Sequence, residues 1–280
     1  MKNVSPYLDD AFVFHQAVCN KKRNQDADLN YKNRLSLLDG NIQHLFNQYD
    51  AAFAGNNLQA LGPHGYVDPD RKDLHSLYKY KSSTLQKLKT KVTTTPSGRK
   101  VQCQNCTLNE VNTLDHLLPK EEFPEYSVNP KNLFPCCSRC NSYKGENWRA
   151  AGLRTSLNLY IDQLPDVQYL FVNTEIGHNY IETVFYLDNP NGVDDILFNL
   201  IYSHYTEMFL LQRFAETADD VITSFRSILE SARNKLSLAD TRDLAKDIIA
   251  KEQLAFGFNY WQSVLKSSLI DDEDFLIDFE

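Results

Sequence analysis

The chain has 280 residues, of which 42% are hydrophobic and 12% aromatic, and its formal net charge is −8 at pH 7. This composition excludes a wholly disordered chain and allows a sizeable buried core. No apolar run approaches the roughly 18 residues of a membrane helix, and the first residues lack a secretory signal pattern, so we expect a cytoplasmic protein with no membrane segment. Six cysteines, four of them in metal-ligand spacing, are typical of a reducing compartment.

Residues 1–70 form a polar region that we expect to be mostly helical. Leu35, Leu38, Ile42 and Leu45 recur at the spacing of one helix face. Nothing in this region indicates a function.

The segment from Arg71 to Lys100 is strongly basic, with nine Lys or Arg residues and one acid, Asp73. Apolar residues between Leu77 and Val92 recur at helical spacing and predict one basic helix, which ends near Gly98. Such a helix could lie along a nucleic-acid backbone, although a solvated helix face is the simpler alternative. The candidate nucleic-acid contacts here are Lys87, Lys91, Arg99 and Lys100.

Two Cys-x-x-Cys pairs follow, Cys103 with Cys106 and Cys137 with Cys140. Each spacing lets two thiolates reach one tetrahedral zinc ion, and four sulfurs leave no open position for water or substrate. The zinc would therefore be structural. Cys136 competes for the second pair, but only Cys137 has the required spacing to Cys140. A zinc ribbon without catalysis is the alternative interpretation of the same cysteines.

The residues between and after the cysteine pairs predict a strand at Val111–Leu117, a loop at 118–130, a strand at Asn132–Pro135 and a helix from Ser138 to about Arg149. Polar residues with catalytic potential lie on or beside these elements. They are Asp115, His116, Asn132 and Asn141.

These residue types suit the hydrolysis of a phosphodiester. His116 could take a proton from water near neutral pH, and Asp115 with Asn141 could offer oxygen ligands to Mg²⁺ or Mn²⁺. Adjacent strand residues point to opposite faces, so Asp115 and His116 share a site only if the strand ends there, as Pro119 indicates. Lys144 and Arg139, near Asn141, are candidates for contacts with DNA phosphates.

The segment from Cys103 to Gly145 resembles an HNH endonuclease core, the ββα-metal nuclease fold, in its zinc-bearing form. The first motif residue falls on His116 within Asp-His-Leu-Leu-Pro, the second on Asn132, and the third on Asn141 within Cys-Asn-Ser-Tyr-Lys. Many family members have His at the third position, where this chain has Asn. The resemblance implies that Asn132 braces the loop that carries His116. HNH proteins of this build also resemble effector subunits of bacterial antiphage defence, often paired with an ATPase subunit, and restriction enzymes.

The charge reverses beyond residue 150. Residues 151–280 carry nine basic and 22 acidic residues, a net charge of −13, whereas residues 1–150 sum to +5. This asymmetry places a nucleic acid on the N-terminal part. We expect the acidic part to dock a protein partner, to self-associate or to mask the basic part.

The acidic region should contain short strands followed by helices. Alternating patterns at Leu157–Asp162, Gln168–Asn173 and Tyr180–Leu187 predict two or three short strands, and helical patterns follow. The expected helices are Val193–Phe214, Asp219–Ala232 and Asp240–Phe256. The mixed acidic and apolar tail, residues 271–280, is expected to dock rather than to be disordered.

The expected architecture is α+β, with N-terminal helices (1–70), a basic helix plus HNH core (71–150) and an acidic, mainly helical region (151–280). The expected function is a DNA endonuclease that uses a divalent cation and a structural zinc. The alternatives are a zinc-stabilised DNA-binding or scaffold subunit without cleavage, and a nuclease acting on RNA.

Overall fold

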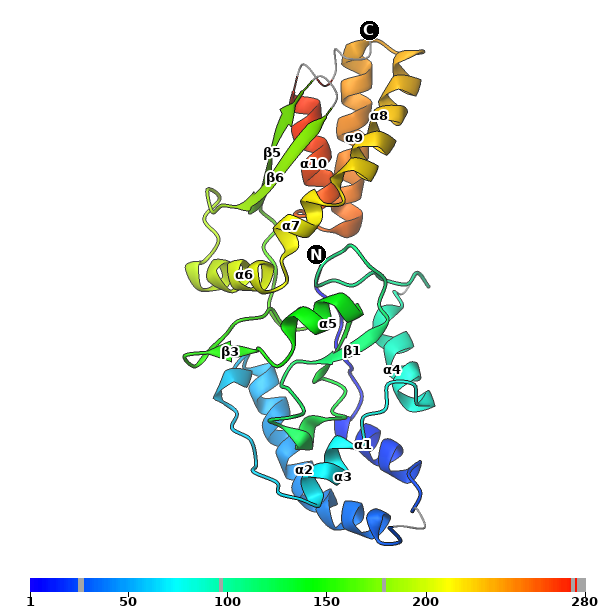
Figure 1. The fold of residues 1–280 in the computed structure, drawn as a ribbon, viewed down its shortest axis with the longest axis vertical. Coiled ribbons are helices and arrows are strands. Elements are labelled where there is room, and N and C mark those ends of the chain that lie inside the picture. The colour runs from blue at the N-terminus through cyan, green and yellow to red at the C-terminus, as the bar shows by residue number, and fades with distance from the viewer. Residues whose placement is uncertain (25–27, 96–97, 178–179, 273–274, 276–280) are drawn as a thin grey trace. The chain divides into compact units, whose positions relative to one another are not determined.

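The computed structural model describes residues 1–24, 28–95, 98–177, 180–272 and 275. The chain forms two compact units (Figure 1). The N-terminal unit is Asn3–Gln163. The C-terminal unit consists of the described residues of Leu164–Glu280 together with Met1–Lys2. Each unit combines helices with small antiparallel sheets, so the predicted α+β class is confirmed.

Four helices begin the N-terminal unit: α1 (Ala11–Asn20), α2 (Tyr31–Ala54), α3 (Asp70–His75) and α4 (Ser83–Thr93). Helix α2 contains the predicted apolar stripe, continues it to Phe53, and buries Phe46 and Tyr49. These rings contact Tyr126 of the 3₁₀ turn η2 (Pro124–Tyr126), with ring centroids 6.2 and 4.9 Å apart. Helix α2 therefore supports the loop between the two cysteine pairs.

The single basic helix predicted between residues 71 and 92 was wrong, because α3 and α4 are separated by a non-helical connection. Side-chain hydrogen bonds divide the segment: Ser76 Oγ donates to the Asp73 carbonyl at 2.8 Å, and Ser82 Oγ caps α4 by accepting from the Leu85 N–H at 3.5 Å. Ser side chains compete with helical backbone bonds in this way. The basic residues are therefore distributed over two helices and a loop.

The cysteine-rich segment folds as strand, loop, strand and helix. Strand β1 (Thr113–His116) pairs antiparallel with β2 (Leu133–Cys136), and α5 (Ser138–Lys144) follows (Figure 1). This is the predicted order, although the helix ends at Gly145, whose φ of 54° breaks it before Arg149. A further strand pair, β3 (Arg149–Ala150) with β4 (Leu153–Arg154), lies beyond it.

The strand predicted at Leu157–Asp162 was also wrong: these residues form a buried turn. The Asn158 carbonyl accepts hydrogen bonds from the N–H groups of Ile161 and Asp162, at 2.9 and 2.8 Å. The Asp162 carboxylate accepts from the Asn158 N–H at 2.7 Å and pairs with Arg154 at 2.6 Å. The buried Asp162 carboxylate requires these hydrogen-bond donors, and the turn supplies them. The alternation of apolar and polar residues, from which the strand was predicted, does not show that a carboxylate will be buried.

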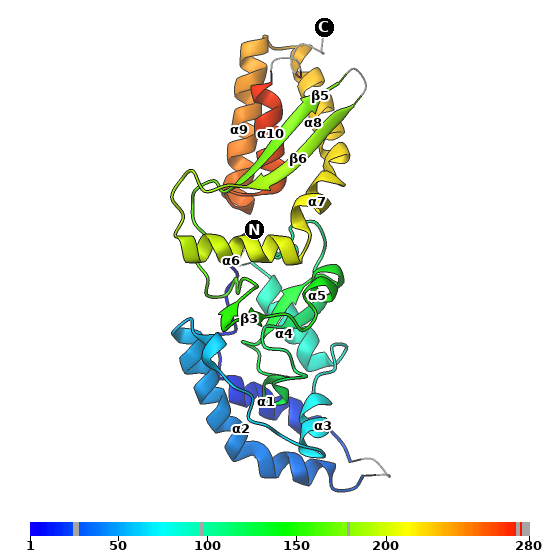
Figure 2. The ribbon, with the colours of Figure 1, turned by 60° about the vertical axis from the view of Figure 1, so that its left-hand side comes forward.

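In the C-terminal unit a β-hairpin packs against helices (Figures 1 and 2). Strands β5 (Leu170–Ile176) and β6 (Ile181–Leu187) pair antiparallel, and Val172 opposite Phe185 belongs to the buried face. The helices are α6 (Asp195–Glu207), α7 (Leu210–Ala215), α8 (Ala218–Arg233), α9 (Leu238–Phe256) and α10 (Trp261–Asp271). Phe214 stacks on Trp261 with centroids 5.4 Å apart, which joins α7 to α10.

Two features of this unit differ from the sequence prediction. The single helix expected at Val193–Phe214 divides into α6 and α7 at Phe209, which has a left-handed φ of 52°, and α10 was not predicted. The docking expected of the acidic tail falls largely on residues 273–274 and 276–280, which lie outside the described residues.

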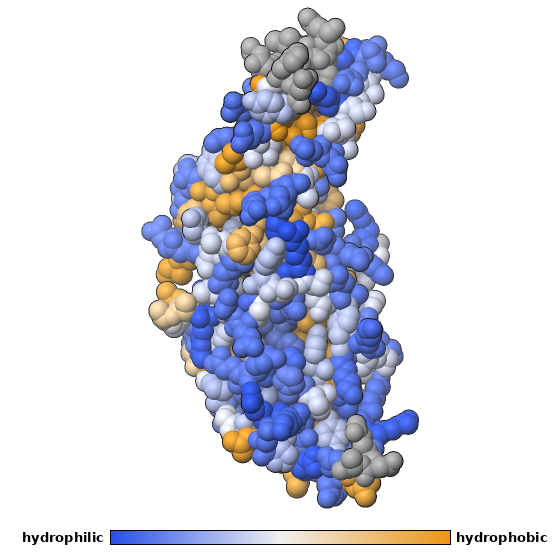
Figure 3. All heavy atoms as spheres, in the orientation of Figure 1, coloured by the Kyte–Doolittle hydropathy of each residue, from blue (hydrophilic) through white to orange (hydrophobic). Residues whose placement is uncertain are grey.

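Among the described residues, every helix is too short or too polar to cross a bilayer. Hydrophilic side chains cover most of the N-terminal unit on the face shown in Figure 3.

The buried Asp162 carboxylate gives a test of the N-terminal unit. Its side chain is 2% exposed, so Asp162→Ala leaves the Arg154 guanidinium without its carboxylate partner and should lower the free energy of unfolding by about 3 kcal/mol. The exposed Glu146→Ala should change it by less than about 0.5 kcal/mol. Urea unfolding followed by tryptophan fluorescence measures the free energy of unfolding of both variants. A Trp261→Phe background leaves Trp148 as the reporter for this unit. Equal stability of the two variants would contradict the role of the turn.

Candidate functional site

Four cysteines from two separate segments converge in the core of the N-terminal unit. The sulfur atoms of Cys103, Cys106, Cys137 and Cys140 lie within 4.8 Å of one another, and all four residues are buried. The Sγ atoms of Cys106 and Cys137 are 3.9 Å apart, close to the separation of about 3.8 Å that tetrahedral zinc with Zn–S bonds of about 2.3 Å requires. These residues could hold a zinc ion. Cys136 is buried but is not part of the cluster.

Local backbone geometry brings each cysteine pair to the cluster. In the first pair, the chain turns so that the Thr107 N–H donates to the Cys103 carbonyl at 2.7 Å, and Thr107 adopts a left-handed φ of 54°. In the second pair, Cys137 caps α5 and its sulfur accepts from the Cys140 N–H at 3.4 Å. N–H groups directed at sulfur stabilise thiolates, so a zinc here would join the first turn to α5.

His116 ends β1 and is held in one orientation. Its side chain is buried, and Nε2 lies 2.9 Å from the Ser127 carbonyl oxygen. The Tyr78 ring packs edge-on against the imidazole, with centroids 4.5 Å apart, while its hydroxyl donates to the Leu114 carbonyl at 2.7 Å. Burial lowers the pKa of His116 to about 3, so the imidazole is neutral at pH 7.

Asn132 connects the two ends of the loop between β1 and β2. Its side-chain oxygen accepts from the Leu118 N–H at 2.8 Å, and its side-chain nitrogen donates to the carbonyls of Leu118 and Tyr126 at 3.0 and 3.2 Å. The Tyr49 hydroxyl of α2 donates to the same side-chain oxygen at 3.3 Å. Asn132 is fully buried, so these bonds hold the backbone immediately after His116.

Asp115 lies beside His116 but its carboxylate is already paired. The Lys144 ammonium is 3.2 Å from one carboxylate oxygen and donates to the His116 carbonyl at 2.8 Å. Burial raises the pKa of Asp115, and the positive charge of Lys144 opposes that effect. Lys144, which the sequence suggested as a phosphate contact, is thus directed into the protein and is 3% exposed.

Asn141 lies on α5 one turn before Lys144, and α5 packs on β1. Asn141 is half-buried, and its side-chain amide makes no hydrogen bond to any described residue. Arg139 is exposed, with its guanidinium 5.6 Å from the centre of the Tyr143 ring.

The remaining basic candidates lie at the surface. Lys87, Arg99 and Lys100 are exposed. Lys91 is exposed as well, but it pairs with Asp9 and lies 4.7 Å from the centre of the Tyr7 ring.

Three contributors to this site were not identified from the sequence: Tyr49, Tyr78 and Ser127. Ser127 acts through its backbone carbonyl, which any residue has, and the two tyrosines come from segments distant in sequence. Neither kind of contribution leaves a sequence pattern that could have indicated it.

Comparisons with known proteins give two partial similarities. The chain is 27% identical to protein ea31 of Escherichia phage lambda over 194 residues, which cover 64% of each chain. It is 44% identical to the Septu protein PtuB of Bacillus thuringiensis over 48 residues, 16% of this chain and 18% of that protein. No family model matches the chain. No solved structure matches it either.

The cysteine cluster predicts a specific metal dependence. Cys103→Ser should lose most of the bound zinc and destabilise the cysteine-rich segment, since structural zinc sites contribute about 10 kcal/mol or more of binding free energy. Cys136→Ala, next to a ligand but outside the cluster, should retain the zinc. Elemental analysis by mass spectrometry and thermal unfolding measure both variants. Equal zinc contents in the two variants would exclude this assignment of the ligands.

Proposed function

We propose that this protein is a metal-dependent HNH-type endonuclease that hydrolyses phosphodiester bonds in DNA, with His116 as the general base. The hydrogen bond between His116 Nε2 and the Ser127 carbonyl is the observation that carries the proposal. A carbonyl oxygen can only accept, so Nε2 must carry the proton. The other ring nitrogen, Nδ1, therefore has the lone pair that a general base needs.

The surroundings of His116 fix its protonation state and its orientation. Neutral imidazole is the form that removes a proton from water, and burial keeps His116 in that form at pH 7. The same lowered pKa makes His116 a weak base, since a general base works best with a pKa near the operating pH, so the role would require bound metal or substrate to change this environment. Asn132 holds the backbone that follows His116, and the Tyr78 ring packs against the imidazole. These contacts would hold the base in a fixed orientation toward the attacking water.

A divalent cation is the second component of the proposal. The Asp115 carboxylate and the Asn141 amide oxygen are donors of the kind that Mg²⁺ or Mn²⁺ takes, and the bound ion would stabilise charge on the phosphate and leaving oxygen. Because the Lys144 ammonium pairs with Asp115, metal binding there would require Lys144 to move away. The displaced ammonium would then be available to a DNA phosphate.

A role in antiphage defence extends the proposal. The short similarity to the Septu protein PtuB supports it, together with the HNH resemblance of the cysteine-rich segment. In this role, the acidic C-terminal part would dock a protein partner, for which an ATPase subunit is the first candidate. DNA would bind the basic N-terminal part.

One observation favours a second candidate, a zinc-stabilised DNA-binding or scaffold subunit without cleavage. The Asp115 carboxylate is buried and neutralised by Lys144, so it does not present a free charge to a cation. Salt-dependent DNA binding without cleavage in Mg²⁺ or Mn²⁺ would support this candidate.

The nuclease proposal predicts that His116→Ala reduces the nicking of supercoiled plasmid in Mg²⁺ by about 100-fold or more, because general-base catalysis contributes this much. His44→Ala, which removes an exposed histidine, should nick at the parent rate. Zinc content and circular dichroism show whether each variant is folded. If folded His116→Ala nicks as fast as the parent protein, His116 is not the base.

The substrate is tested by the same assay with RNA and DNA of one sequence, with and without divalent metal. Cleavage of DNA that requires Mg²⁺ or Mn²⁺ is the expected result. Preferential cleavage of RNA would retain the catalytic assignment but replace the proposed substrate.

A further inference from the structure

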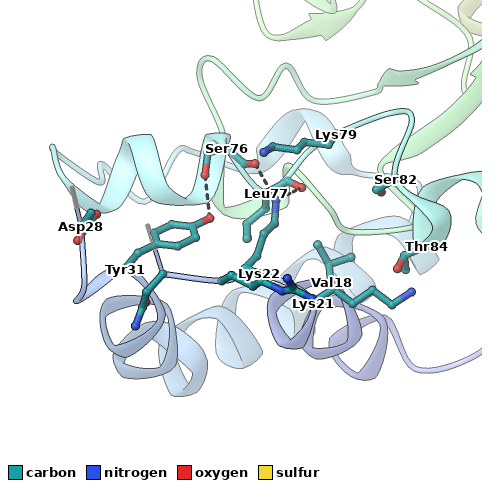
Figure 4. Close-up of a pocket in the computed structure, with 12 residues that line it drawn as sticks. Val18, Lys21, Lys22, Asp28, Tyr31, Ser76, Leu77, Lys79, Ser82 and Thr84 are labelled. Atoms are coloured by element: carbon teal, nitrogen blue, oxygen red, sulfur yellow. Dashed lines mark hydrogen bonds between the residues drawn. The ribbon is translucent and has the colours of Figure 1, made fainter. Parts of the chain in front are cut away.

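A second region of the N-terminal unit, away from the cysteine cluster in sequence, forms a cavity with a volume of about 460 Å³. It lies between the end of α1, the start of α2, the connection from α3 to α4, and the first turn of α4 (Figure 4). The volume is within the range of about 300–1,000 Å³ that is typical of small-molecule sites.

The lining of this cavity is cationic. Lys21, Lys22 and Arg23 come from the end of α1 and the residues after it, and Lys79 comes from the connection between α3 and α4. The acid among the described lining residues is Asp28, and it is already paired: its two carboxylate oxygens accept from the Arg34 guanidinium at 2.9 and 2.6 Å. Among the lining residues that the structure describes, the positive charge is therefore largely uncompensated, which favours an anionic occupant.

Lys22 extends across the cavity. Its ammonium donates to the carbonyls of Ser76 and Leu77, at 2.9 and 3.0 Å (Figure 4). Burial lowers the pKa of Lys22 to about 8, and the neighbouring positive charge of Lys79 contributes in the same direction. An anion bound in the cavity would counteract both effects, because its negative charge would stabilise the protonated form of Lys22.

The first turn of α4 adds hydrogen-bond donors to the same wall. Ser82 caps this 11-residue helix, and the N–H groups of Ser83 and Thr84 have no acceptor within the helix. Thr84 lines the cavity, is 9% exposed, and its hydroxyl has no hydrogen-bond partner. A buried hydroxyl without a partner costs free energy, and a ligand oxygen would remove that cost once the Thr84 side chain rotated to turn its hydroxyl toward the cavity.

We propose that this cavity binds a phosphate group, carried either by a free nucleotide or by a nucleic-acid backbone. Several lysines, a helix N-terminus and an unpaired hydroxyl together match the charge and the acceptor oxygens of phosphate. Lys79 and Thr84 contact the phosphate, and Lys22 supplies charge from the opposite wall. The site does not depend on the nuclease activity proposed for His116.

The test is a titration of the full-length protein with inorganic phosphate, AMP and a short single-stranded DNA, at constant ionic strength and without divalent metal. Phosphate should raise the melting temperature more than chloride does, and calorimetry should detect binding of AMP or the oligonucleotide. Lys79→Gln and Thr84→Val should each weaken binding on the order of tenfold, through loss of a charge-assisted or a buried hydrogen bond. Lys81→Gln, which removes an exposed lysine outside the lining, should bind like the parent protein.

Preferential binding of AMP identifies the free nucleotide as the source, and preferential binding of the oligonucleotide identifies the nucleic-acid backbone; either result supports the phosphate site. No effect of phosphate beyond that of chloride would overturn the proposal, as would undiminished binding by both Lys79→Gln and Thr84→Val. Because no divalent metal is present, these outcomes are independent of whether the protein cleaves DNA.

Discussion

The convergence of four buried sulfurs is the constraint on which the cysteine-rich segment depends. Four thiolates at these distances would repel one another without a cation between them, and the geometry of Cys103, Cys106, Cys137 and Cys140 is one that could hold a zinc ion. The two cysteine pairs are about thirty residues apart in the sequence. The short strands β1 and β2 and the short helix α5 would be marginal on their own, and the cluster supplies their common anchor.

A second set of contacts organises the loop between the strands, which contains little regular structure. Asn132 binds the backbone at Leu118 and Tyr126, and the Ser127 carbonyl binds His116. The rings of Phe46 and Tyr49 on α2 pack beneath Tyr126. A long loop normally has conformational freedom, and here the backbone at Leu118, Tyr126 and Ser127 has buried side-chain partners. The orientation of His116 is thus a property of the whole N-terminal unit.

Charge is distributed unevenly at several scales. The acidic C-terminal part and the basic N-terminal part differ by 18 charges, from −13 to +5. Within the basic part, individual lysines have different environments: Lys144 is buried against Asp115, Lys22 binds backbone carbonyls, and Lys87 is exposed. The connection between α3 and α4 links two of the sites, since Leu77 and Lys79 line the cationic cavity while Tyr78 between them packs on His116. An ion bound in the cavity would therefore lie next to the backbone that positions Tyr78.

The sequence by itself determined the four thiols that could share a metal, the α+β class, and the order of strand, loop, strand and helix around His116. Cysteine spacing and local apolar periodicity carry this information because a turn or a helix face involves only neighbouring residues. Tertiary structure decided the helix break at Phe209, and turned Leu157–Asp162 from a predicted strand into a turn around the buried Asp162 carboxylate. It also decided that Lys144 pairs with Asp115 and that Tyr78 meets His116. These outcomes depend on which polar groups become buried together, and burial is settled by packing between segments that are distant in the chain.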